Sequence, residues 1–159
     1  MDYLDVMLTI LQVYFLLMNV TVERFYCQGP AFKAGDSRFL VAETIAFCEV
    51  NNRLFLQRPD WMVTATCFSA YCLSFGYLLI VFTTWTNLWR RLAVPLLLLC
   101  GVKLNAILFY HVMEFTSASP PEHLAAYFSV EGPYILSMGL VILKVSQALY
   151  AKGPRPKAE

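Results

Sequence analysis

The sequence predicts an all-α fold, a four-helix transmembrane bundle, and three observations lead to this prediction. Four long apolar stretches occupy residues 3–22, 62–84, 92–113 and 126–149. Each is long enough to cross the hydrocarbon core of a bilayer, which takes about 20 residues of helix. Hydrophobic residues make up 58% of the chain and charged residues 14%, a composition that would give a soluble protein a largely apolar surface. Residues 23–61 form the one long segment between the predicted spans.

We expect a single domain over residues 1–151, followed by a polar tail at residues 152–159. The first apolar stretch has no basic residue before it and no small-residue cleavage site after it. It is therefore expected to remain as a transmembrane helix rather than to be removed as a signal peptide.

The segment between the first two spans is expected to be partly helical. Asp36 or Ser37 can cap a helix whose first turn begins near Arg38. Residues 39–56 mix apolar side chains with charged ones, which makes them too polar to cross a membrane. We expect a helix here that packs on the mouth of the bundle or lies in the membrane interface.

Three prolines help to place the remaining helices. Pro59 precedes the second span, with Trp61 at the depth of the lipid headgroups. Pro95 falls in the first turn of the third span, where its missing N–H costs little. Pro133 lies well inside the fourth span, so it should kink that helix or leave a carbonyl free.

Polar residues inside the spans are the candidate functional residues, because a buried charge in a membrane is costly unless it has a partner. Lys103, near the middle of its span, is the expected partner of Glu131 or Glu23. Two interpretations stay open: a buried pair that joins helices, or a polar cluster that lines a ligand cavity. Lys144 is expected to extend its amine to the interface. The cavity candidates are Asn19, Glu23, Lys103, Asn105, Glu131 and Tyr134.

The five cysteines have no metal-binding or redox spacing. Cys67, Cys72 and Cys100 lie in apolar stretches and are expected to be reduced packing residues. Cys27 and Cys48 lie near an interface, and their redox state is left open.

Other ligand classes find little support in the sequence. His111 and His123 are far apart and form no metal set with nearby glutamates, so no metal and no other cofactor is expected. The net charge is +1 and there is no basic cluster, which argues against nucleic acid as a partner.

Lysine and arginine placement predicts the orientation, because cytosolic loops are enriched in both. Arg90 and Arg91 lie between the second and third spans, and further basic residues follow the fourth. Since four crossings put both termini on one side, the termini and the Arg90–Arg91 loop are expected on the cytosolic or matrix side.

Several short motifs resemble those of the EXPERA superfamily, which includes the emopamil-binding sterol isomerases and the sigma-2 receptors. The stretch at 33–39, containing Gly35, Asp36, Ser37 and Arg38, is similar to the K-x-G-D-S-R-aromatic motif of the isomerases. Residues 19–23 are similar to the His-x-x-x-Glu of their first helix. Residues 56–61 and 129–134 look more like the sigma-2 branch.

The resemblance implies a four-helix fold and, in the isomerases, a double-bond shift that needs an acid and a base in a dry cavity. Glu23 matches one acidic position of the family. Asn19 stands where the isomerases carry histidine, and an asparagine cannot exchange protons. Two registers compete for the second acid, one with Glu43 and one with Glu49. A catalytically degenerate member is therefore expected.

The expected function is that of a non-catalytic membrane protein, an accessory or structural subunit of a larger membrane complex that binds lipid or sterol in its helix cavity. The alternatives are a sterol delta-8 to delta-7 isomerase and a stand-alone sterol- or amphiphile-binding protein. Expected partners are membrane lipids, including sterol, and other membrane-protein subunits. The resemblance favours the endoplasmic reticulum, whereas a subunit role is compatible with the mitochondrial inner membrane.

Overall fold

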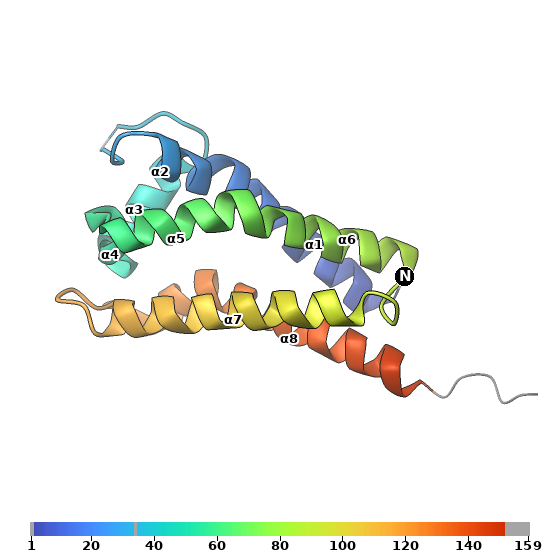
Figure 1. Cartoon of the computed structure of the whole chain (residues 1–159). Helices are drawn as coiled ribbons and strands as arrows, with labels where there is room; N and C mark the ends of the chain where they lie inside the picture. Colours follow the sequence, from blue (N-terminus) through green and yellow to red (C-terminus); the bar gives the residue numbers. More distant parts are fainter. Residues whose placement is uncertain (1, 34, 152–159) are drawn as a thin grey trace, which may run out of the picture.

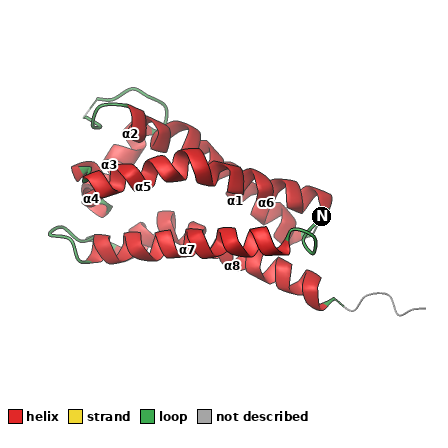
Figure 2. Ribbon diagram, in the orientation of Figure 1, coloured by secondary structure: helices red, strands yellow, loops and turns green. Residues whose placement is uncertain are grey.

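The structure is an all-α four-helix bundle, as the sequence predicts (Figures 1 and 2). The computed structural model describes residues 2–33 and 35–151, so the predicted tail at 152–159 lies outside the described residues. Four helical stretches are long and apolar enough to cross a membrane: Tyr3–Gln28, Asp60–Thr86, Ala93–Phe115 and Leu124–Tyr150.

The first two of these stretches each contain a π-helical turn. The first is built from α1 (Tyr3–Met18), the π-helix η1 (Asn19–Glu23) and α2 (Arg24–Gln28). The second is built from α5 (Asp60–Phe68), the π-helix η2 (Ser69–Leu73) and α6 (Ser74–Thr86). The third and fourth are the single helices α7 (Ala93–Phe115) and α8 (Leu124–Tyr150).

Helix ends follow the capping chemistry of the sequence. The first stretch continues six residues past its predicted end because polar side chains such as Arg24 and Gln28 do not stop a helix, whereas the extended backbone at Gly29 does. Pro59 precedes α5, and Pro95 lies in the first turn of α7, as predicted. Pro133 lies inside α8, which continues as a helix on both sides.

The segment between the first two spans contains α3 (Val41–Asn51) and α4 (Arg53–Gln57), which confirms that it is partly helical. The predicted cap at Asp36 or Ser37 is wrong. Helix α3 begins only after Leu40, whose φ of 62° is left-handed and lies outside the helical region. Asp36 is already used: its Oδ1 accepts hydrogen bonds from the Arg38 backbone N–H and from Arg38 Nε, at 3.1 and 2.9 Å.

Arg38 fastens this loop to the end of α2. Its guanidinium lies 5.2 Å from the ring centroid of Phe25 and 5.3 Å from that of Phe32. The same guanidinium holds the pKa of the Asp36 carboxyl below its usual value through their side-chain hydrogen bonds. Gly35 has a φ of 83°, a conformation that favours glycine. The motif that resembles the EXPERA family therefore shapes a loop.

The main hydrophobic core lies toward one end of the bundle. We call this the Arg90 end, because it carries the loop at residues 87–92, and we call the opposite end the α3–α4 end. Residues from α1, α6, α7 and α8 meet in this core, among them Leu8, Ile80, Leu96 and Val141. A smaller cluster around Tyr26, Leu54 and Met62 lies at the α3–α4 end.

Lys144 extends its amine to the acidic first turn of α1, at the Arg90 end of the bundle. Its side chain is buried, and Nζ lies 2.7 Å from Asp5 Oδ1 and 3.0 Å from Asp2 Oδ2. The ammonium also lies 5.7 Å from the Trp89 ring. The sequence did not indicate this pairing, because it does not show which helix Lys144 faces.

The prediction that Cys67 is reduced is also wrong. Cys67 of α5 forms a disulfide with Cys27 of α2, 40 residues earlier in the chain. Cys48, Cys72 and Cys100 are free. Cys100 is buried as predicted, whereas Cys72 is free but exposed and so is not a packing residue. The apolar surroundings of Cys67 could not reveal this bond, because they do not show which helix its side chain faces.

Replacing Lys144 with methionine is expected to lower the free energy of unfolding by about 3 kcal/mol, because it leaves the Asp5 carboxylate buried without its cation. Equilibrium unfolding in mixed micelles measures the effect. Lys33→Met, at an exposed lysine, is the control and should change stability little. The double variant Asp5→Asn/Lys144→Met should lose less than Lys144→Met alone. Equal stability of Lys144→Met and Lys33→Met would contradict this assignment.

Candidate functional site

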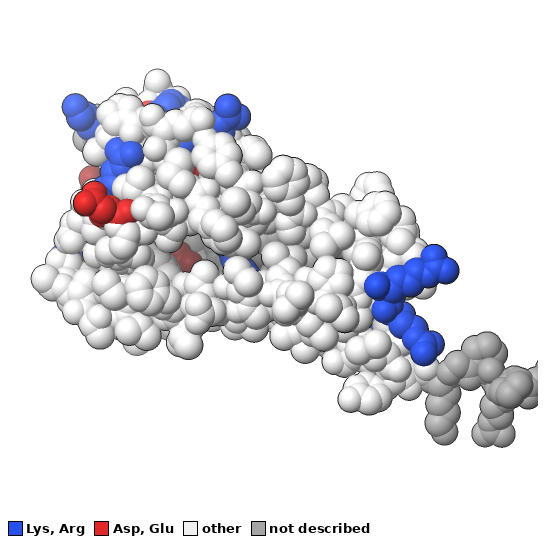
Figure 3. Space-filling view, in the orientation of Figure 1, with Lys and Arg blue, Asp and Glu red and all other residues white. Residues whose placement is uncertain are grey.

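A cavity of about 430 Å³ opens between the helices, from the middle of the bundle toward the α3–α4 end. All four membrane-spanning stretches contribute to its wall, and α3 closes part of it. In the space-filling view, an opening between the surfaces of α5 and α7 reveals acidic and basic atoms in its depth (Figure 3). Ala65 of α5 and Ala106 of α7 line the cavity and are exposed. The cavity is thus open on the side that would face lipid.

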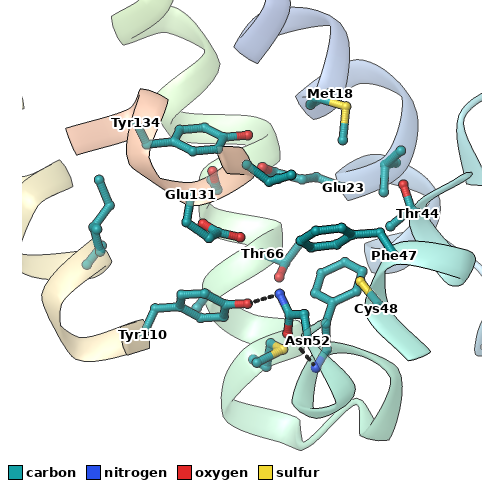
Figure 4. Close-up of a pocket in the computed structure, with 18 of the residues that line it drawn as sticks. Met18, Glu23, Thr44, Phe47, Cys48, Asn52, Thr66, Tyr110, Glu131 and Tyr134 are labelled. Atoms are coloured by element: carbon teal, nitrogen blue, oxygen red, sulfur yellow. Dashed lines mark hydrogen bonds between the residues drawn. The ribbon is translucent and has the colours of Figure 1, made fainter. Parts of the chain in front are cut away.

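Four of the six cavity candidates line this cavity: Glu23, Lys103, Glu131 and Tyr134. Glu23 from η1 and Glu131 from α8 point into the same space, close to Tyr134 (Figure 4). One carboxylate oxygen of Glu23 is buried without a hydrogen-bond partner among the described residues. The structure therefore brings together Glu23, Glu131 and Lys103 within a mainly apolar wall, which Glu43 of α3 also lines.

Lys103 makes no direct ion pair with Glu23 or Glu131, which corrects the prediction. No carboxylate oxygen of the described residues lies within 4.0 Å of its amine. Its Nζ lies instead 3.5 Å from Ser69 Oγ and 5.2 Å from the ring centroids of both Tyr77 and Tyr134. The amine is held mainly by aromatic faces.

Asn19 does not line the cavity, contrary to prediction. Its side chain is fully buried between the two π-helical stretches, where Nδ2 donates to the Ser69 carbonyl oxygen at 3.0 Å and to Ser74 Oγ at 3.1 Å. An amide inside a membrane must find partners within the protein, and the irregular backbone at η2 offers one. Asn19 therefore joins the first two spans.

Asn105 does not line the cavity either, contrary to prediction. It lies near the middle of α7 but is exposed on the outside of the bundle, away from the cavity. Lys103 and Asn105 are two residues apart on a helix, a spacing that turns their side chains to different faces.

The structure separates Glu43 and Glu49, the two candidates for a second acidic residue. Glu43 lies on α3 at the exposed edge of the cavity, whereas Glu49 on the same helix is exposed and does not line it. The motif residues Gly35, Asp36, Ser37 and Arg38 lie outside the cavity wall.

Aromatic and amide side chains close the cavity at the α3–α4 end. Asn52, between α3 and α4, donates a hydrogen bond from its side chain to the hydroxyl of Tyr110 on α7 (Figure 4). Trp61 of α5 packs edge-on against Phe109 of α7, with ring centroids 5.5 Å apart. Sequence reasoning missed Asn52, which is an ordinary polar residue in a polar segment and carries no distinguishing pattern.

The cavity can bind a molecule, but its residues do not form a metal site. No group of three histidine, cysteine, aspartate or glutamate side chains in the described part of the chain is placed to hold a metal ion. Cys48 lines the cavity as a buried free thiol, and burial raises its pKa.

Comparison of the chain with models of known protein families, with curated proteins and with solved structures finds no match in any of the three.

Replacing Asn19 with leucine is expected to lower the free energy of unfolding by about 1–2 kcal/mol, because two hydrogen bonds within the membrane are lost. Asn105→Leu is the matched control: it removes the same side chain from an exposed position of α7 and should not lower stability. Unfolding in mixed micelles compares the two variants. Equal stability of both variants would show that Asn19 does not join the helices.

Proposed function

We propose that this chain is a non-catalytic membrane protein of the EXPERA type that binds a lipid- or sterol-sized molecule in the cavity between its helices. The observation that carries the proposal is the cavity itself. Its volume of about 430 Å³ lies within the range of roughly 300–1,000 Å³ that small-molecule sites occupy. Its wall is mainly apolar and contains a few convergent polar groups, the usual composition of such a site.

The free-energy cost of burying polar groups without partners favours a ligand-binding role for these residues over a role in packing alone. A buried carboxylate without a hydrogen-bond partner destabilises the fold, and Glu23 carries one such oxygen. Side chains that join helices bond across them, as Lys144 and the amide nitrogen of Asn19 do, although Asn19 Oδ1 has no partner among the described residues either. Glu23, Lys103 and Glu131 instead leave hydrogen-bonding capacity that a ligand can use.

The loss of catalysis is supported by Asn19. It has no proton to exchange, and both of its side-chain hydrogen bonds hold the second span in place. The alternative, a sterol delta-8 to delta-7 isomerase, draws on the two carboxylates in one cavity, because Glu23 and Glu131 can in principle act as an acid and a base.

A second proposal, that the chain is an accessory subunit of a larger membrane complex, is supported by the outer face of α7. Asn105 presents its amide near the middle of the span, where lipid offers no hydrogen bond. Gly101, one turn away, is also exposed, and a side chain there would meet open space. A small residue beside a polar one on a membrane helix favours close association with a neighbouring helix.

The disulfide supports an orientation. Basic side chains lie at both ends of the bundle, so their distribution alone does not decide which end faces the cytosol (Figure 3). Disulfides persist in oxidising compartments and are rare in reducing ones. We therefore place Cys27, Cys67 and the α3–α4 end in the lumen of the endoplasmic reticulum or in the mitochondrial intermembrane space. The Arg90 end and both termini then face the cytosol or the matrix.

The binding proposal predicts that the purified protein binds a tritiated sterol or a labelled amphiphile saturably in detergent or nanodiscs. Glu23→Gln should weaken this binding by about tenfold, the size expected for one hydrogen bond to a buried charged group. Glu49→Gln, at an exposed glutamate outside the cavity, is the matched control and should bind normally. The absence of saturable binding to the unmodified protein would contradict the proposal.

The same preparations distinguish the alternatives. Chromatography of the bound sterol reveals any shifted double bond, which would favour the isomerase. Light scattering gives the particle mass, and a lone chain of 18.1 kDa after mild extraction would contradict the subunit proposal.

The orientation proposal predicts that cysteines introduced at opposite ends react differently in sealed vesicles. Arg90→Cys should react with a membrane-impermeant maleimide in intact microsomes, whereas Ala118→Cys should react only after the vesicles are opened. Cys27 and Cys67 should stay unreactive after denaturation until a reductant is added. The reverse labelling of the two introduced cysteines would overturn the orientation.

A further inference from the structure

Lys103 is the one cation among the described residues that line the cavity. Its side chain is 7% exposed, and its Nζ lies between rings from two different helices, Tyr77 of α6 and Tyr134 of α8. Both ring centroids are 5.2 Å from the nitrogen, within the distance of about 6 Å over which a cation is attracted to an aromatic face. The protein thus fills an aromatic cation site with its own lysine.

This arrangement has a consequence for ligands that carry an amine. Aromatic surroundings of this kind are the usual means of binding an ammonium group. Of the two rings, that of Tyr134 lines the cavity, so a cationic ligand would compete with Lys103 for the Tyr134 ring. It would come to lie close to the Lys103 ammonium, and like charges repel strongly where water is largely excluded. Lys103 also offsets part of the negative charge of Glu23, Glu43 and Glu131, the three glutamates that line the cavity and would otherwise attract a cation.

A neutral hydroxyl group is not repelled by the Lys103 charge. It can donate its hydrogen to the Glu23 oxygen that has no partner among the described residues, and its oxygen can accept a hydrogen bond from Lys103. The Lys103 ammonium has three N–H donors. Among the described residues it makes one hydrogen bond, a long one of 3.5 Å to Ser69 Oγ, so it can donate to a ligand as well. The hydrogen and the oxygen of a hydroxyl both find a partner, whereas an ammonium group can donate to the carboxylate but cannot accept a hydrogen bond from Lys103.

We propose that Lys103 makes the cavity selective for neutral lipids with a hydroxyl head, such as sterols or long-chain alcohols, and against cationic amphiphiles of the same shape. The inference rests on the proposed binding function and names the ligand class for the same cavity. Lys103 is the specificity-determining residue, and removing its charge opens the aromatic site to an amine.

Two matched ligand pairs test this selectivity, each differing in the head group alone. Cholesterol is compared with its 3-amino analogue, and oleyl alcohol with oleylamine. Binding is measured to the full-length protein in nanodiscs. The unmodified protein should bind the hydroxyl member of a pair at least about tenfold more tightly than the amine. Tight binding of the sterol pair alone, or of the alcohol pair alone, identifies the lipid body that the cavity accepts.

Two substitutions of Lys103 test whether its charge causes the preference for the hydroxyl ligand. Lys103→Met should bind the amine member about tenfold more tightly than the unmodified protein does, and should bind the hydroxyl member less tightly. Lys103→Arg keeps the charge and should keep the preference for the hydroxyl. Lys33→Met, an exposed lysine outside the cavity, should leave both affinities unchanged.

The preference of the unmodified protein for hydroxyl or amine ligands tests the proposal even without a variant. Equal or tighter binding of the amine by the unmodified protein would overturn the inference, as would an unchanged preference in a folded Lys103→Met variant. Either result would leave the proposed binding function in place. Failure of all four ligands to bind would overturn the binding function itself, and the inference with it.

Discussion

A side chain that carries a charge or an amide inside a bilayer must find its partners within the protein, because lipid tails offer none. This constraint determines how the spans are joined. Near the Arg90 end, Lys144 of α8 is paired with the acidic first turn of α1. One layer deeper, Gln12 of α1 donates a hydrogen bond to Ser137 of α8. Near the middle of the bundle, Asn19 links the two π-helical turns. Each joint fixes one helix against another where apolar contact alone would allow rotation.

Beyond the Asn19 joint, toward the α3–α4 end, the charged residues that line the cavity form no ion pair among the described residues. Glu23, Lys103 and Glu131 line a shared cavity, and Lys103 is held by aromatic faces. The disulfide between α2 and α5 keeps the first two spans together at this end, and α3 covers the space between the helices. The bundle is thus closely packed and internally paired at one end and hollow at the other. That division supports a binding protein whose cavity is held open by covalent and polar links around it.

The sequence predicted the four spans well because hydropathy and length are properties of each stretch alone. The structure also confirms three predictions that rest on local sequence. Pro59 precedes a helix, Pro95 lies in the first turn of a helix, and the polar segment 39–56 is partly helical. The errors at Asn19, Asn105 and Cys67 share one cause: each depends on how a helix is rotated about its axis. In a membrane both the lipid-facing and the inner faces are apolar, so the usual periodic signal is weak. The π-helices add a further shift, because each inserts an extra residue into its turn.

The central claim is that the hollow end of the bundle holds one lipid molecule, and native mass spectrometry of the protein released from its own membrane tests this most directly. Ala106→Trp would fill the opening between α5 and α7, whereas Val102→Trp, one turn away and outside the cavity wall, would not. The account predicts the mass of the chain plus one neutral lipid for the unmodified protein and for Val102→Trp, and the bare chain for Ala106→Trp. A bare chain in all three preparations, or the same bound lipid in all three, would contradict it.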